Sequence, residues 1–242
     1  MVYKRVLLKF SGEALANNNK EKIYDPFVFE RLINFIKSFH AYNKMEVAVV
    51  VGAGNIWRGR NNVGIKFDAA ESDYIGMLGT VMNAIALKDQ LIQAGVDAVI
   101  LSAFLIEGIA EKTTPELANK YLEAGKIVLF AGGTGKPFFT TDTGAAMRAI
   151  DINADAIIMA KDGVDGLYTK NPHVYRDAQK IASASYQDLI DIKIEALDLS
   201  ALELLKETNI HLLVLGMDEV KSFETVEEHI EIGTIVKRGV TL

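Results

Sequence analysis

The sequence contains no cysteine, which excludes disulfide bonds and thiolate metal sites. It has four histidines, and they are scattered without the close spacing of metal ligands: His40, His173, His211 and His229. We therefore assign no residue of the chain to a metal site. The absence of cysteine also fits a reducing compartment without requiring one.

An excess of positive charge is also missing. The chain has 26 lysine and arginine residues against 32 aspartate and glutamate residues, for a net charge of -6. Nucleic-acid-binding domains usually carry a basic patch or stripe, so we expect no nucleic-acid partner. No stretch approaches the ~18 apolar residues of a membrane helix. The apolar run near the N-terminus is shorter than that of a signal peptide and is followed at once by Lys9 and Glu13. We expect a cytoplasmic protein without a membrane partner.

Both common nucleotide-binding motifs are absent. After Gly52 and Gly54, a dinucleotide-binding fingerprint requires glycine at position 57, where Trp57 stands. Lys136 follows Gly135 as in a P-loop, but Pro137 comes next and Phe130 occupies the place of the first glycine of that motif. A nucleotide would therefore have to be bound by another arrangement.

What the sequence does contain is an alternation of apolar strands and amphipathic helices. With 242 residues, of which 50% are hydrophobic, the chain is long enough to bury a substantial core. The strand patterns cover 6–8, 46–51, 98–101, 126–130, 156–160, 211–215 and 234–237, and the helix patterns cover 25–39, 71–94, 114–125, 143–150 and 198–205. Such an alternation predicts an α/β fold with a mostly parallel sheet.

Three glycine loops directly follow predicted strands, at 9–12, 52–58 and 132–142. Because the carboxyl ends of parallel strands meet at one edge of a sheet, we expect these loops to lie together and to bind a ligand. Glycine loops and helix N-termini offer backbone N–H groups to anions. Phe138 and Phe139 add apolar faces on which a flat ring could lie. Each loop on its own could equally be a simple connection.

Several single residues also have two interpretations. Lys9 could face a phosphate or be a solvated lysine at a strand end, and Arg58 could clamp a phosphate or be a surface charge. Asp73 could accept hydrogen bonds from ribose hydroxyls or favour a helix start through its charge. Asp198 is also a good helix N-cap, and Tyr168 could stack on a ring or pack in a turn.

Taken together, these segments resemble the amino acid kinase family, and within it the bacterial uridylate kinases. The similarity covers essentially the whole chain in the right order. Its motifs are 9–15, 52–59, Asp73 with 76–83, 133–142 and 164–166. The most specific of them is the string Thr-Gly-Lys-Pro-Phe-Phe-Thr-Thr-Asp at 134–142.

The resemblance implies a single domain, 1–242, with a three-layer αβα sandwich around a mostly parallel sheet. Its acceptor-binding portion would be roughly 1–150 and its ATP-binding portion roughly 151–242. The implied reaction is UMP + ATP → UDP + ADP in pyrimidine nucleotide biosynthesis, with Mg²⁺ bound through the ATP phosphates. The resemblance also implies a homohexamer that GTP activates and UTP inhibits.

The resemblance also assigns roles to individual residues. The catalytic residues would be Lys9, Arg58 and Asp198, with Asp198 orienting Lys9 or the metal-bound phosphates. ATP would be bound by Lys9, Phe10, Ser11, Gly12, Gly54, Arg58, Asp162, Tyr168 and Asn171. UMP would be bound by Ala53, Asp73, Thr134, Gly135, Lys136, Pro137, Phe138, Phe139, Thr140 and Thr141.

Three positions depart from the family pattern. Ala53 stands where glycine is common, Lys136 where asparagine is expected, and Asn171 where aspartate is usual. Two other functions stay open at this point. One is a kinase of the same family that phosphorylates a carboxylate or carbamate, although a small acid needs no aromatic wall. The other is a nucleotide-binding sensor without catalytic activity, against which the joint presence of Lys9, Arg58 and Asp198 argues.

Overall fold

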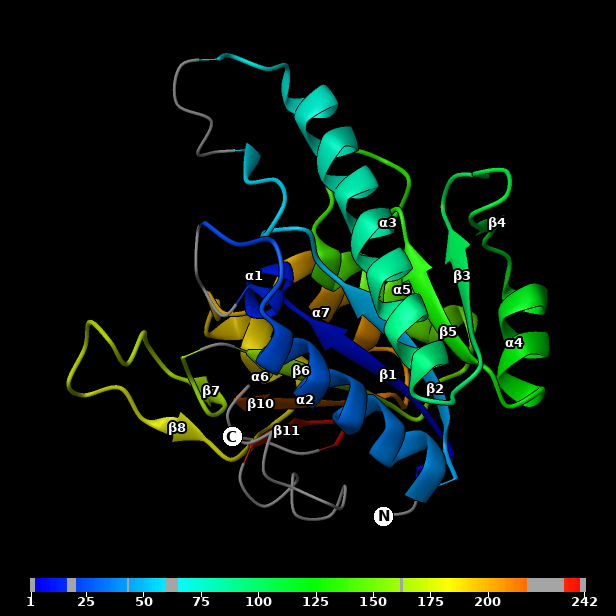
Figure 1. Cartoon of the computed structure of the whole chain (residues 1–242). Coiled ribbons are helices and arrows are strands. Elements are labelled where there is room, and N and C mark those ends of the chain that lie inside the picture. The colour runs from blue at the N-terminus through cyan, green and yellow to red at the C-terminus, as the bar shows by residue number, and fades with distance from the viewer. Residues whose placement is uncertain are drawn as a thin grey trace.

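The computed structural model describes residues 3–16, 21–42, 44–59, 65–161, 163–216 and 233–239. Its main feature is a nine-stranded sheet with the strand order β4-β3-β5-β2-β1-β6-β10-β11-β9 (Figure 1). The strands are β1 (Arg5–Phe10), β2 (Glu46–Val51), β3 (Ala98–Ser102), β4 (Glu111–Lys112), β5 (Ile127–Ala131), β6 (Ala156–Lys161), β9 (Ser183–Ala184), β10 (His211–Gly216) and β11 (Thr234–Val236). All neighbours from β4 to β10 are parallel, β11 is antiparallel to β10, and β9 is parallel to β11.

Helices cover both faces of this sheet. They are α1 (Gly12–Leu15), α2 (Pro26–Lys37), α3 (Ala69–Gln93), α4 (Pro115–Glu123), α5 (Thr141–Asp151), α6 (Tyr186–Asp191) and α7 (Leu199–Leu205), with a π-helix, Ser38–Tyr42, after α2. Apolar residues of α2 and α3 form a core on one face. Residues of α4, α5, α6 and α7 form a second core on the other face. Figure 1 shows α2 and α3 in front of the sheet with α5 and α7 behind it. The predicted three-layer α/β fold is confirmed.

The helix starts follow from capping side chains. Asp25 and Thr114 cap α2 and α4, each followed by a proline at the first helical position, as the sequence predicts. Helix α3 begins two residues earlier than expected because the Asp68 carboxylate accepts hydrogen bonds from the N–H groups of Ala70 and Glu71. Helix α6, which starts at a capping box, was not predicted from the sequence.

The central strands end at the same level of the sheet. In the parallel register, Lys9 on β1 pairs with Val50 on β2 and with Met159 on β6. The segments that follow β1, β2 and β6 therefore leave the sheet at one edge. A small antiparallel pair, β7 (Leu167–Tyr168) and β8 (Lys180–Ile181), projects beside this edge (Figure 1).

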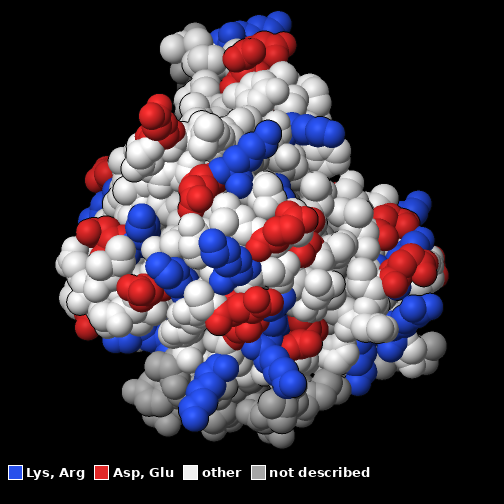
Figure 2. Space-filling model, turned by 90° about the vertical axis from the view of Figure 1, so that its right-hand side faces the viewer, with Lys and Arg blue, Asp and Glu red and all other residues white. Residues whose placement is uncertain are grey.

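The surface in Figure 2 carries basic and acidic side chains interspersed rather than gathered by sign. No helix in the described residues is long and apolar enough to cross a membrane. Among the same residues, no group of three or more His, Cys, Asp or Glu side chains is placed to hold a metal ion.

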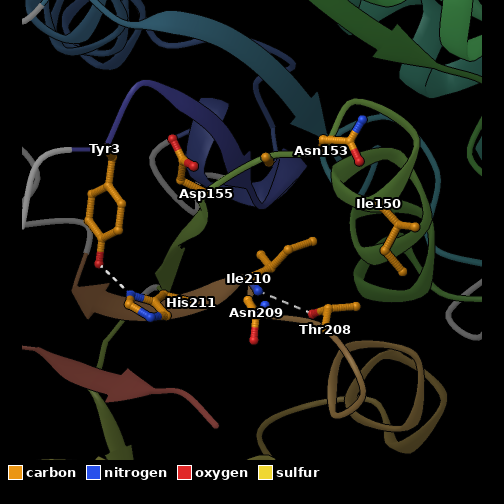
Figure 3. A pocket seen from close by; sticks show the side chains of 9 residues that line it. Tyr3, Ile150, Asn153, Asp155, Thr208, Asn209, Ile210 and His211 are labelled. Atoms are coloured by element: carbon orange, nitrogen blue, oxygen red, sulfur yellow. Dashed lines mark hydrogen bonds between the residues drawn. The ribbon is translucent and has the colours of Figure 1, made fainter.

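A pocket of about 450 Å³ lies at the opposite, amino-terminal edge of the sheet (Figure 3). The Tyr3 hydroxyl and Nδ1 of His211 lie 2.9 Å apart beside it. Burial, with a smaller contribution from Asp155, raises the pKa of Tyr3 to about 12, so this hydroxyl stays protonated. Burial and the nearby charge of Lys237 lower the pKa of His211, against the opposing effect of Asp155. A neutral His211 ring can then accept a hydrogen bond from Tyr3.

This pair predicts a pH-dependent stability. The unfolded chain protonates His211 near its ordinary pKa of 6.5, whereas the folded chain does so only at lower pH. The free energy of unfolding should therefore be unaffected by His211 well above that value and should fall as the pH drops through it. Urea unfolding between about pH 8 and about pH 5 measures this. In His211→Asn, which keeps an acceptor for Tyr3, the decline should be smaller; an identical decline in both proteins would contradict the assignment.

Candidate active site

The three glycine loops meet at the carboxyl edge of the sheet. A β-carbon on Gly12 would lie 2.4 Å from the carbonyl oxygen of Gly52 and 2.6 Å from the nitrogen of Gly54. A β-carbon on Gly52 would lie 3.6 Å from Oγ1 of Thr141. The loops after β1, β2 and β5 are thus in direct contact, and Gly12 has no room for a side chain.

Lys9 lies at this junction with only 9% of its surface exposed. Its Nζ is 2.6 Å from Oδ1 of Asp142, in the first turn of α5. A second lysine, Lys161, ends β6 and donates a hydrogen bond from its Nζ to the carbonyl of Ala196. Burial and the positive charge of Lys9 lower the pKa of Lys161, while Asp142 opposes them. Two lysines and one carboxylate therefore share a largely buried, positively charged spot.

Arg58 is fixed above the loop that follows β2. Its Nε donates to the Gly54 carbonyl at 2.7 Å and lies 3.2 Å from Oε1 of Glu13. Its two terminal nitrogens have no protein partner among the described residues. Ser11 caps the short helix α1 by accepting a hydrogen bond from the N–H of Glu13. The Phe10 ring is buried in the core and packs against Phe35, so Phe10 could reach a ligand only through its backbone.

The loop between β5 and α5 is held from α3. Oγ1 of Thr80 accepts a hydrogen bond from the N–H of Gly132 at 2.8 Å. Oδ2 of Asp73 accepts one from the N–H of Phe138 at 2.7 Å. Phe138 has a φ of 70°, in the left-handed region that is unfavourable for an aromatic residue, and its side chain is 74% exposed. Phe139 is 50% exposed beside it. Helix α3 thus keeps two aromatic rings accessible at the rim of the site.

Hydroxyl groups order the remainder of this loop. Oγ1 of Thr134 donates to the Lys136 carbonyl and accepts from the Lys136 N–H, which closes a tight turn before Pro137. The N–H of Gly135 donates a hydrogen bond to the Gly132 carbonyl at 3.0 Å, which closes the turn before it. The Lys136 side chain is exposed.

Asp198 lies where α5 meets α7. Its Oδ2 accepts hydrogen bonds from Thr140, at 2.8 Å, and from Thr143, while its Oδ1 accepts from the N–H of Ser200 and so caps α7. Burial would raise the pKa of Asp198, but these hydrogen bonds outweigh it and hold the pKa below its usual value. The carboxylate that pairs with Lys9 is Asp142; Asp198 instead binds Thr140, at the end of the loop after β5, and Thr143 in α5.

A cavity of about 590 Å³ opens beside the β7-β8 pair. Tyr168 and Asn171 line it, together with Ile192 to Ala196. The Tyr168 hydroxyl donates to Asp165 at 2.7 Å, and Oδ1 of Asn171 accepts from the N–H of His173 at 3.0 Å. The volume of this cavity is typical of pockets for small organic ligands. Asp162 lies outside the described residues.

The residues at this site to which the sequence assigned no role include Asp142, Thr143 and Lys161. Lys161 comes at the carboxyl end of an apolar strand, as Lys9 does, so the reasoning that singled out Lys9 could also have singled out Lys161. Asp142 ends the string 134–142 that the sequence analysis found most specific, but its pairing with Lys9 depends on contacts between distant segments. The whole arrangement offers lysines, an arginine and backbone N–H groups next to exposed aromatic rings, which suits two anionic ligands side by side.

The chain is similar to known proteins along nearly its whole length. Residues 4–216 match the model of the amino acid kinase family. A uridylate kinase of Oenococcus oeni is 42% identical over 97% of both chains, and one of Pediococcus pentosaceus is 41% identical over the same share. The crystal structure of a UMP kinase from Bacillus anthracis, 33% identical, superposes with a TM-score of 0.94 over 100% of this chain and 99% of the other. A UMP kinase from Ureaplasma parvum, 32% identical, gives 0.90 over 98% and 100%. The chain therefore belongs to the amino acid kinase family and, within it, to the uridylate kinases.

Proposed function

We infer that the chain transfers the γ-phosphoryl group of ATP to UMP, giving UDP and ADP. The inference rests on the composition of the site. The chain that carries this site is 42% identical to a uridylate kinase over 97% of its length. A buried lysine–carboxylate pair and two contacting glycine loops lie next to a loop with two exposed aromatic rings. This combination suits transfer between two nucleotides, because a small carboxylate acceptor has no use for the rings.

Phosphoryl transfer requires in-line positioning and charge compensation rather than covalent chemistry by the protein. Lys9 would neutralise charge on the transferring group, and Asp142 would hold its ammonium in place. Lys161 would add a second cation at the same point. The terminal nitrogens of Arg58 would reach phosphate oxygens from the loop after β2.

We further propose how the two nucleotides divide the chain. UMP would be bound by residues within 1–150, against Ala53, Asp73 and the acceptor loop 134–141. ATP would be bound mainly by residues within 151–242, with its base in the cavity beside Tyr168 and Asn171, and its phosphates would reach back to Ser11, Gly12 and Gly54. Asp162 would also bind ATP. In this scheme Asp198 orders the acceptor loop through Thr140 and Thr143.

When bound through the ATP phosphates, Mg²⁺ supplies further positive charge at the transferring group. The ion prefers oxygen ligands and commonly takes only one or two carboxylates beside phosphates and water. Asp142 and Asp198, two carboxylates at this edge, are already bound to Lys9 and to Thr140 and Thr143, so Mg²⁺ would be held mainly through the phosphates. We also propose that the protein is a homohexamer in the cytoplasm, activated by GTP and inhibited by UTP. These points rest on membership of the family alone.

The acceptor is tested by a coupled assay of ADP release with Mg²⁺ and ATP. UMP, CMP, dTMP, acetylglutamate and carbamate would be compared at equal concentrations. We expect turnover with UMP and little with the others. Turnover with a carboxylate or carbamate instead would keep the fold and overturn the nucleotide acceptor site. Binding of UMP without any turnover would point to a nucleotide sensor.

A further inference from the structure

A buried carboxamide lies behind the glycine loop that follows β2. Asn83, on α3, is fully buried. Its Nδ2 donates to the carbonyl oxygen of Gly52 at 2.7 Å and to Oδ1 of Asn55 at 2.9 Å. Helix α3 approaches the loop so closely that a β-carbon on Gly79 would lie 2.9 Å from the Ala53 methyl group. The helix and the loop are therefore one packed unit.

Asn83 and Asn55 form a reciprocal amide pair. Nδ2 of Asn55 donates to Oδ1 of Asn83 at 3.1 Å and to the carbonyl of Ile23 at 2.9 Å. The orientation of Asn83 is fixed because the Gly52 carbonyl can only accept, so the atom that faces it must be the nitrogen. All donors of both side chains are used. A fully satisfied buried network of this kind holds its partners in one arrangement.

The hydrogen bond to Gly52 also decides where the next N–H group points. In a planar trans peptide, the carbonyl and the following N–H point in opposite directions. With the Gly52 oxygen held against Asn83, the Ala53 N–H must point away from α3. The N–H groups of Ala53, Gly54 and Asn55 have no acceptor among the described residues. A run of unpaired N–H groups on a glycine loop is a site for an anion.

We propose that Asn83 is a positioning residue for phosphoryl transfer. It holds the Gly52–Ala53 peptide so that the Ala53 N–H faces the phosphoryl group as it moves between the nucleotides. This role rests on the function proposed above. Loss of one donor aimed at a transition state lowers kcat about 100-fold or more, with little change in ground-state binding.

The test uses Asn83→Asp and Asn83→Leu, which are close to asparagine in size. Near neutral pH, both should lower kcat about 100-fold while the KM values for UMP and ATP change by less than about threefold. In Asn83→Asp, an ionised carboxylate repels the Gly52 carbonyl, whereas a protonated carboxyl group can donate to it. The kcat of Asn83→Asp relative to wild type should therefore rise as the pH falls, and that of Asn83→Leu should not.

Leu87→Ala is the matched control. Leu87 lies one turn further along α3, is fully buried, and belongs to the core rather than to the amide network. This variant should lose thermal stability but keep its kcat at temperatures where it is folded. The proposal is overturned if folded Asn83 variants keep wild-type kcat, if they raise KM alone, or if Leu87→Ala loses kcat equally. Absence of UMP turnover in the wild-type protein would instead overturn the proposed function.

Discussion

Replacing Lys9 with methionine is expected to lower kcat about 1,000-fold, with smaller changes in the KM values. Methionine keeps most of the length of the lysine side chain but carries no charge. The ammonium group lies largely buried, where a charge acts on a phosphoryl group more strongly than in water. Steady-state kinetics with ATP, Mg²⁺ and UMP measure the effect.

The control for Lys9→Met addresses stability. Removing one partner of a buried ion pair leaves the other uncompensated, which costs about 3–5 kcal/mol, so Asp142 alone would destabilise the variant. The double variant Lys9→Met/Asp142→Asn removes both charges. It should recover much of the lost thermal stability and none of the lost kcat. Recovery of kcat together with stability would exclude Lys9 from the mechanism.

Replacing Asp73 with alanine should act on acceptor binding. The carboxylate accepts the N–H of Phe138 at 2.7 Å and keeps that residue in a left-handed conformation. Hydrogen bonds to charged groups contribute about 1.5–3 kcal/mol, which corresponds to about 10- to 150-fold in affinity. We therefore expect KM for UMP to rise by about that factor, with KM for ATP changed by less than about threefold.

Asp68→Ala is the matched control for Asp73→Ala. Asp68 lies on the same helix and caps it, so its loss costs about 1 kcal/mol of stability without touching the acceptor loop. Its KM for UMP should stay at the wild-type value. Equal increases in KM for both variants would show that the effect of Asp73→Ala comes from α3 stability and not from the loop.

The fold was predictable because its signals are local. Apolar strands followed by glycine, and helix caps such as Asp25 and Thr114, are visible in short windows of sequence. Parallel pairing then places the loops after β1, β2 and β5 at one edge, where the structure brings them into contact. The same reasoning identified Lys9 and Arg58 as candidates, and their catalytic roles stay predictions.

The finer structure of the site depends on contacts between distant segments. The position of α5 beside β1 pairs Asp142 with Lys9. The packing of α5 against α7 brings Thr140 and Thr143 to Asp198. The bond from Asn83 to Gly52 joins residues 31 positions apart. The left-handed conformation of Phe138 could not be predicted, because phenylalanine rarely adopts it and the hydrogen bond from its N–H to Asp73 joins two distant segments.

The most direct test of the central claim is ³¹P NMR of the reaction mixture. Wild-type protein would be incubated with UMP, ATP and Mg²⁺, and all phosphate signals would be followed over time. The account predicts that the two phosphate signals of UDP grow in step with those of ADP, without a comparable release of inorganic phosphate. Formation of ADP and inorganic phosphate without UDP, or no reaction although UMP is bound, would contradict it.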